Sequence, residues 1–143
     1  MTVEQLSVFV ENKPGKLAEA LETLADAKID LRALSLADTS DFGILRAIVD
    51  KPEKALEVLN KAGFLVKSNE VVAVVVGDKP GGLASVVRIL SEAGVDIEYT
   101  YAFVAHSSDN AYVILRVGNN EAAIKVLTMS GITLLTGKEL YSM

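Results

Sequence analysis

The chain contains an internal duplication, and this feature constrains its fold more than any other in the sequence. With a shift of 66 residues, the segment VFVENKPGKL at 8–17 matches VVVGDKPGGL at 74–83. The segment ILR at 44–46 recurs at 114–116, and Gly63 recurs as Gly131, with shifts of 70 and 68. Because the shift changes in only two places, the insertions lie in loops between elements that keep their order. The chain therefore consists of two copies of one module.

Within each copy, the period of the apolar residues indicates the secondary structure. In the first copy, strands are expected at 5–11, 31–37, 43–49 and 64–67, and helices are expected to begin near Leu17 and Pro52. In the second copy, strands are expected at 71–76, 97–105, 111–117 and 132–135, and helices at 81–93 and 120–130. The order strand, helix, strand, strand, helix, strand predicts an α+β fold. We expect two tandem ferredoxin-like βαββαβ modules, each with an antiparallel sheet and its helices on one face.

The expected domains are residues 1–69 and 70–143. A module of about 70 residues buries only about 60 % of its unfolded surface, so the pair is expected to fold as a unit. The aliphatic run at 71–76 places apolar side chains on both faces of its strand, and we expect both faces to be covered.

In the second strand of each copy, the sequence does not clearly show which residues lie on which face. Simple alternation places Ile97, Tyr99, Tyr101 and Phe103 on one face, whereas the leucines of the first copy, at 34 and 36, have the opposite phase. This mismatch indicates a bulge in the first copy, at a position that the sequence does not give. The aromatic residues themselves fit either core and interface packing or stacking against a ligand.

Composition and charge exclude several classes of function. The sequence has no cysteine and a single histidine, His106, which excludes a thiolate metal site, a disulfide framework and a cysteine nucleophile. His106 lies among serines, where a solvated loop residue is expected, and it has no second histidine for zinc or partners for a catalytic triad. Asp38 and Asp41 flank a short polar segment and are interpreted as turn formers. We expect no enzyme activity, no metal and no cofactor.

The net charge of -5 and the lack of a Lys/Arg cluster argue against nucleic acid and anionic membranes as partners. The N-terminal residues lack the basic region of a signal peptide. The longest aliphatic run has six residues, far fewer than the roughly 20 that span a bilayer. We therefore expect a cytoplasmic protein.

The repeated Lys-Pro-Gly turn is the main candidate for chemistry. The first backbone N–H groups of the helix that follows have no partner within the helix and carry the positive end of its dipole. Gly15 and Gly81 leave access to these groups, which favour a small anion. Asn12 can donate and accept, and Asp30 or Asp96 can accept from an ammonium group. These groups suit the two ends of a free α-amino acid.

A structural interpretation of the turn stays open beside this one. Proline and glycine after a strand are ordinary turn residues, and Asn12 or Asp78 can cap its own helix. No nucleotide-binding glycine motif is present. Because Asp78 repels a carboxylate at neutral pH and Asn12 does not, the first turn is the preferred carboxylate site.

Together, the segments VFVENKPGKL, AKIDL and GILRAIV, and their second copies VVVGDKPGGL, AGVDI and YVILRV, resemble two tandem ACT domains. ACT domains are small regulatory modules attached to many enzymes of amino-acid metabolism. The resemblance covers roughly residues 4–69 and 70–142. It implies modules that pair, with an amino-acid effector held at their junction.

The resemblance also implies binding residues. In relatives that bind amino acids, the Asn or Asp and the Gly of the turn contact the ligand, with a polar residue at the start of the second strand, often from the neighbouring module. The matching positions are Asn12, Gly15 and Asp30 in the first copy and Asp78, Gly81 and Asp96 in the second. Further candidates of the two turns are Lys13, Pro14, Leu17 and Leu83. We also expect Glu98, Tyr99 and Tyr101 of the second copy to close the first-turn site from across the junction. Asp30 and Asp96 depart from the asparagine of some serine-binding relatives, so the ligand is not identified by them. Glu98 is an alternative acceptor for the ammonium group.

The expected function is a non-catalytic sensor of a free amino acid that forms a homodimer and acts through assembly or on a separate enzyme of amino-acid metabolism. The alternative is an interaction module of the same fold that has lost its pocket. A small hydrolase of the acylphosphatase type needs an arginine in the loop after the first strand, and residues 11–16 contain none.

Overall fold

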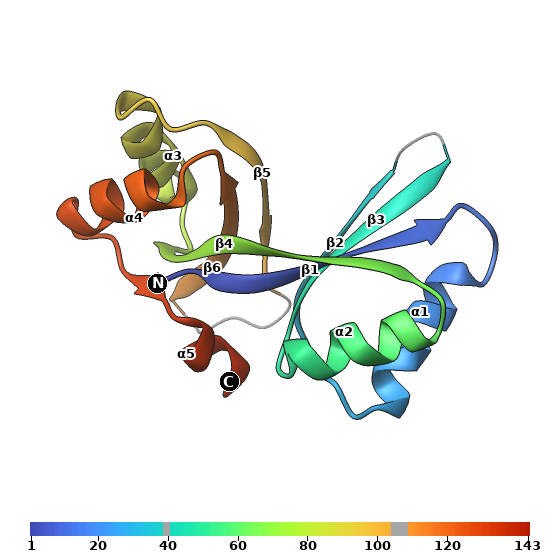
Figure 1. The fold of residues 1–143 in the computed structure, drawn as a ribbon. Coiled ribbons are helices and arrows are strands. Elements are labelled where there is room, and N and C mark those ends of the chain that lie inside the picture. The colour runs from blue at the N-terminus through green and yellow to red at the C-terminus, as the bar shows by residue number, and fades with distance from the viewer. Residues whose placement is uncertain (39–40, 104–108) are drawn as a thin grey trace. The chain divides into compact units, whose positions relative to one another are not determined.

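The computed structural model describes residues 1–38, 41–103 and 109–143, and in these it contains seven strands and five helices (Figure 1). In chain order the elements are β1 (Val3–Glu11), α1 (Lys16–Asp26), β2 (Leu31–Asp38), β3 (Phe42–Val49), α2 (Pro52–Lys61), β4 (Leu65–Gly77), α3 (Gly82–Glu92), β5 (Ile97–Ala102), β6 (Asn110–Val117), α4 (Asn120–Met129), β7 (Leu134–Leu135) and α5 (Gly137–Tyr141).

The chain divides into two compact units, here called the first and the second module. The first module comprises residues 4–69 with 141–143, and the second comprises residues 70–140 with 1–3. These units differ from the expected ranges at both chain ends. The Thr2 hydroxyl donates to the Glu70 carboxylate at 3.1 Å, and the backbone N–H of Glu4 donates to the Tyr141 hydroxyl at 3.2 Å. These contacts explain why residues 1–3 group with the second module and residues 141–143 group with the first.

The first module has the strand order β2-β3-β1-β4, to which β4 contributes residues 65–69. The pairs β2–β3 and β1–β3 are antiparallel. Helices α1 and α2 lie side by side and pack on one face of this sheet (Figure 1). Their buried residues Leu24 and Leu59 join a core with Leu6, Val8 and Leu45 from the strands.

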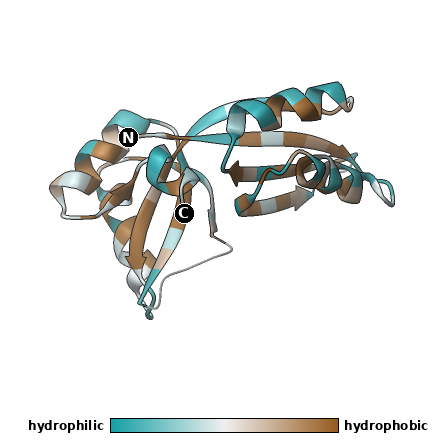
Figure 2. Cartoon of the chain, turned by 90° about the horizontal axis from the view of Figure 1, so that it is seen from below, coloured by the Kyte–Doolittle hydropathy of each residue, from teal (hydrophilic) through white to brown (hydrophobic). Residues whose placement is uncertain are grey.

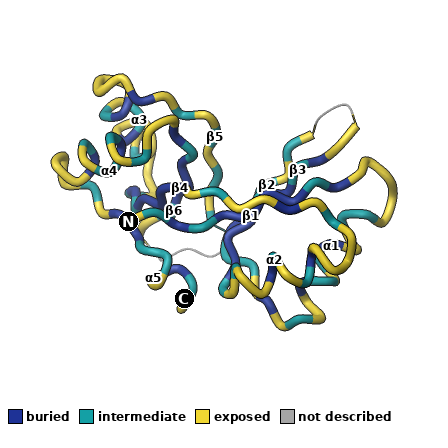
Figure 3. Tube along the Cα trace, in the orientation of Figure 1, coloured by how far each residue is buried: buried dark blue, intermediate teal, exposed yellow. Residues whose placement is uncertain are grey.

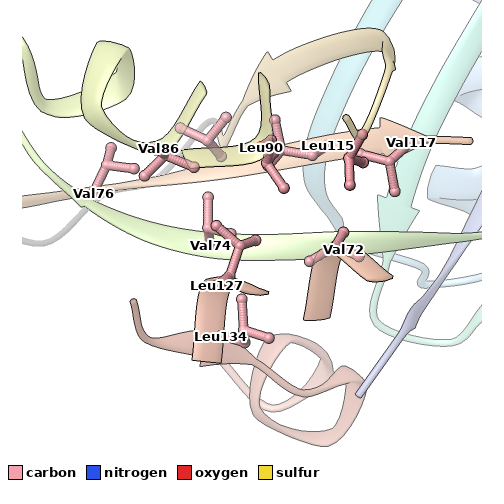
Figure 4. Packing of buried hydrophobic residues seen from close by; sticks show 12 residues of the cluster. Val72, Val74, Val76, Val86, Leu90, Leu115, Val117, Leu127 and Leu134 are labelled. Atoms are coloured by element: carbon pink, nitrogen blue, oxygen red, sulfur yellow. The ribbon is translucent and has the colours of Figure 1, made fainter. Parts of the chain in front are cut away.

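The second module repeats the arrangement with the order β5-β6-β4-β7, all antiparallel, and with α3 and α4 on one face. In its core, Val74 of β4 lies among Val86 and Leu90 of α3, Leu127 of α4 and Leu115 of β6 (Figure 4). Both modules therefore have the expected βαββαβ order and ferredoxin-like topology. The predicted α+β fold class is confirmed.

The bulge that the sequence could not place occurs in both copies. The register of β2 against β3 shifts between Leu31 and Ala33, and that of β5 against β6 shifts between Ile97 and Tyr99. Ile97 therefore pairs with core residue Val117, whereas Tyr99 pairs with Arg116. The prediction that Ile97 shares a face with Tyr99, Tyr101 and Phe103 is wrong, because the extra residue in the strand reverses the alternation.

Several expected boundaries also change. The strands expected at 64–67 and 71–76 form the single strand β4, which runs through both modules. The strand expected at 97–105 ends at Ala102, and residues 104 and 105 lie outside the described part of the chain. The strand expected at 132–135 keeps only Leu134 and Leu135. Helix α5 was not expected.

The burial expected on both faces of the strand at 71–76 is confirmed for residues 71–74 and 76, whereas Val75 is only partly buried. Val71, Val72, Ala73 and Val74 are each 0 % exposed. Figure 2 shows that apolar residues dominate the strands, and Figure 3 shows that buried residues concentrate there, while both helical pairs expose one side. None of the helices in the described part of the chain has both the length and the hydropathy of a membrane-spanning segment.

Candidate functional site

The first turn (residues 11–16) and the second turn (residues 77–82) share two backbone features. Gly15 and Gly81 are the N-caps of α1 and α3 and have φ angles of 88° and 87°. The N–H of Lys13 donates to the carbonyl of Glu11 at 2.8 Å, and that of Lys79 donates to the carbonyl of Gly77 at 2.9 Å. The positive φ explains the glycine, because residues with a side chain are strained there.

Neither turn uses a polar side chain to cap its helix. No side-chain hydrogen bond caps α1 or α3. The Asn12 side chain instead donates from Nδ2 to Oδ1 of Asp38 at 3.1 Å. The positive end of the helix dipole at these turns is therefore not offset by a capping side chain, which favours an anion there.

A pocket of about 340 Å³ adjoins the first turn. It is lined by Val10, Glu11, Asn12, Lys13, Pro14, Leu17, Leu36 and Gly43. Val10, Leu17 and Leu36 provide apolar walls from β1, α1 and β2. Glu11 and Lys13 provide opposite charges at the rim, with Nζ of Lys13 3.2 Å from Oε2 of Glu11. The pocket thus combines both charges with an apolar surface.

Antiparallel pairing brings the far end of β2 to this pocket. Asp38 pairs with Gly43 of β3, and Gly43 pairs with Val10 of β1. A side chain at Gly43 would place its Cβ 3.1 Å from Cδ1 of Leu36, which is tighter than an ordinary contact. Gly43 therefore keeps the space between Leu36 and the first turn open.

The second turn packs more closely than the first. A Cβ at Gly82 would lie 2.1 Å from the carbonyl oxygen of Gly77, so only glycine fits this position. The equivalent position of the first turn is Lys16. The side chain of Lys79 lies close to Gly77, since a Cβ there would be 3.4 Å from its Cε. Asp78 donates its N–H to the carbonyl of Asp109 at 3.1 Å.

The structure brings Asn12, Lys13, Pro14 and Leu17 together at one pocket, with Gly15 in the same turn. The candidates Asp78, Gly81 and Leu83 lie in or directly after the second turn. Leu83 is 37 % exposed.

Asp30 does not lie at the first pocket. It precedes β2, whereas Asp38 at the other end of this strand contacts Asn12. The Asp30 carboxylate is ion-paired with Arg32, and its N–H donates to Oδ1 of Asp50 at 2.9 Å. Within the first module, the carboxylate beside the turn is therefore that of Asp38.

The candidates in the second module form separate groups. Asp96 lines two hollows beside the end of α3, of about 270 and 320 Å³, and its carbonyl accepts from the N–H of Gly118. Glu98 lies 3.3 Å from Nε of Arg116. The rings of Tyr99 and Tyr101 stack with centroids 6.4 Å apart.

Sequence reasoning missed four residues of the pocket lining, Val10, Glu11, Leu36 and Gly43, and it missed the neighbouring Asp38. Asp38 was interpreted as a turn former, although its carboxylate accepts from Asn12. Leu36 was noted only for its phase, although it is 50 % exposed beside the pocket. No local sequence signal marks this residue, because its exposure depends on where the fold places the helices.

The remaining side-chain clusters and hollows are weaker candidates for a binding site. His106 lies outside the described residues. Among those described, no group of three or more His, Cys, Asp or Glu side chains is placed to hold a metal. A hollow of about 460 Å³ lies beside the start of α2, lined by Glu4, Lys51, Pro52, Glu53, Lys54 and Tyr141. Charged residues dominate this lining, and it provides no aliphatic wall comparable to that of the first pocket.

Comparison with known proteins identifies the fold and the family. Protein BT0572 from Bacteroides thetaiotaomicron is 41 % identical, with a TM-score of 0.93, over 100 % of this chain and 98 % of that one. The regulatory subunit of aspartate kinase from Thermus thermophilus is 21 % identical, with a TM-score of 0.64, over 89 % of this chain and 91 % of that one. The corresponding subunit from Thermus flavus is 19 % identical, with a TM-score of 0.62, over 90 % and 92 %.

The two aspartate kinase subunits show a shared fold only. No curated protein matches the chain. The family model described as ACT domain pair matches residues 1–143. The chain, with its duplicated βαββαβ module and repeated strand-to-helix turn, belongs to the ACT domain pair family.

Proposed function

We propose that the protein is a non-catalytic regulatory sensor that binds a free amino acid in the pocket of the first turn. The observation that carries this proposal is the pocket itself, which joins a helix start without a side-chain cap, two opposite charges and an apolar wall within about 340 Å³. A zwitterion with a side chain presents the complementary set of groups. The resemblance implies a ligand at the junction of modules, whereas this proposal concerns a pocket lined by first-module residues alone.

In this proposal, each end of the ligand has a named partner. The carboxylate accepts from the backbone N–H groups at the start of α1 and from Lys13. The ammonium group donates to Glu11. Asp38, beside the turn, already accepts a hydrogen bond from Asn12 Nδ2. Glu11 thus takes the function that the resemblance assigned to Asp30.

We also propose that the protein forms a homodimer and that binding is transmitted to a separate enzyme of amino-acid metabolism. Family membership supports a regulatory function. The fold shared with regulatory subunits of aspartate kinase agrees with it.

Thermal melting of the full chain with each of the twenty amino acids tests the proposal. A ligand at 100 times its dissociation constant adds about 2.7 kcal/mol to the free energy of unfolding. For a chain of 143 residues this corresponds to a rise in melting temperature of roughly 5–10 °C. At least one amino acid should give such a rise at millimolar concentration.

The variant Asn12→Asp should weaken this binding by roughly tenfold or more, because a second carboxylate then faces Asp38 and repels the ligand carboxylate. Asn60→Asp makes the same chemical change on the exposed surface of α2 and should leave binding unchanged. Undiminished binding by Asn12→Asp would count against the assignment of the first turn.

A second candidate function is supported by exposed apolar residues on the edge strand β2 of the first module. Leu34 and Leu36 lie on the same face of this strand and are 39 % and 50 % exposed. Such a pair also suits a protein interface without a small ligand. No shift with any amino acid, together with a melting temperature that rises with protein concentration, would favour this interaction module.

A further inference from the structure

We infer that the first-turn pocket selects an amino acid with a neutral aliphatic side chain, and that Leu36 and Gly43 determine this selectivity. The inference rests on the proposed function, because it names the class of ligand for the same pocket. It is carried by three features of the lining: an uncovered leucine, charges that are already matched, and a glycine that keeps space open.

The apolar wall is larger than the module needs for its own core. Leu36 pairs with Leu45 across β2 and β3, so its side chain lies on the helix-facing side of the sheet. Leu45 is 1 % exposed, but Leu36 is 50 % exposed. Together with Leu17 and Val10 it forms an apolar surface that an aliphatic side chain can cover.

The two charged residues of the pocket pair with the ammonium and carboxylate groups of a bound amino acid. Glu11 and Lys13 are the two charged residues among the eight that line it, and they already form an ion pair with each other. A zwitterion replaces this pair with one partner for each of its ends. A charged ligand side chain would then add a charge that the lining does not match, which disfavours lysine, arginine, aspartate and glutamate.

Gly43 leaves space in the pocket for the side chain of the ligand. A Cβ at this position would lie 3.1 Å from Cδ1 of Leu36 and 3.8 Å from Oδ1 of Asn12, so even one methyl group would fill the space between wall and turn. The second module differs at both positions. Ala102 stands in the place of Leu36, and Ala111 pairs with Val76 as Gly43 pairs with Val10. The selectivity is therefore a property of the first module.

Calorimetric titration of the full chain with a panel of amino acids tests this inference. The panel pairs leucine with asparagine, valine with threonine, and norleucine with lysine, so that shape is similar and polarity differs. The aliphatic member of each pair should bind at least tenfold more tightly, because a polar group placed against an apolar wall loses its water.

Two variants locate the selectivity. Leu36→Gln should weaken leucine binding roughly tenfold while changing glycine binding little, because glycine uses only the main-chain groups. Gly43→Val should reduce leucine binding at least tenfold and shift the preference toward alanine. Leu34→Gln is the matched control, because Leu34 lies on the same strand and the same face without lining the pocket, and its leucine affinity should stay unchanged.

The outcomes separate this inference from the proposed function. If a polar or charged amino acid binds most tightly, or if Leu36→Gln and Gly43→Val leave the preference intact, the inference is overturned while the sensor proposal stands. If no amino acid binds, both are overturned. Melting curves of each variant show whether it is folded before its affinity is compared.

Discussion

The backbone of Gly15 has a φ of 88°, in the left-handed region where residues other than glycine cost about 1–2 kcal/mol. Gly63 has nearly the same conformation, with a φ of 91°, at the end of α2. A Cβ at either position would meet no atom within 4 Å. The two positions therefore have the same conformational requirement, and only Gly15 adjoins the pocket.

Gly15→Ala and Gly63→Ala should each lower the free energy of unfolding by about 1 kcal/mol, because both introduce the same backbone strain. Only Gly15→Ala should also weaken amino-acid binding, since its methyl group lies beside the N–H groups at the start of α1. Urea unfolding and calorimetric titration of the two variants check this. Equal affinity in both variants would remove Gly15 from the site.

At the scale of elements, the order of strands and helices follows from sequence because the apolar period changes at each boundary and the duplication repeats the pattern. The face of β5 could not be predicted, because the register shift between Ile97 and Tyr99 adds a residue that periodicity cannot reveal. Helix α5 has only five residues, which is too few to show a helical period. Asp38 reaches Asn12 through antiparallel pairing, and a local motif carries no information about such a contact.

The close packing at the start of α3 gives a prediction for this element. Gly82→Ala should lower the free energy of unfolding by about 2 kcal/mol or more, because its Cβ would lie 2.1 Å from the carbonyl oxygen of Gly77. Lys16→Ala at the equivalent position of α1 should change it by no more than about 0.5 kcal/mol. Chemical denaturation of both variants measures the difference. If Gly82→Ala leaves the free energy of unfolding unchanged, the second turn can accept a side chain at this position as the first turn does at Lys16.

At the scale of the whole molecule, the two chain ends do not belong to the modules that the repeat assigns them to. Residues 141–143 join the first module, where the carbonyl of Tyr141 accepts from Arg32 at 3.1 Å. The Tyr141 hydroxyl accepts the N–H of Glu4. Sequence comparison of the two copies could not predict this, because the first copy has no segment equivalent to α5.

Tyr141→Phe should lower the free energy of unfolding by about 1 kcal/mol near pH 8, because the N–H of Glu4 loses its acceptor. Burial raises the pKa of Tyr141 above its ordinary value. The native state therefore keeps this hydroxyl protonated where the unfolded chain ionises, and its stabilising effect is lost as the pH rises above about 10. The difference between the two proteins in urea unfolding should shrink from pH 8 to pH 11. A difference that is zero at pH 8, or that grows with pH, would contradict this account.

The central claim is that an amino acid binds at the first turn of this ACT domain pair, and nuclear magnetic resonance of the amide groups tests it most directly. Titration of the full chain with the amino acid that most raises its melting temperature should shift the amide signals of residues 11–17 and 36–38. These shifts should saturate at one ligand per chain, while the amides of residues 77–83 move little. Saturating shifts confined to residues 77–83, or no saturating shift with any of the twenty amino acids, would contradict the claim.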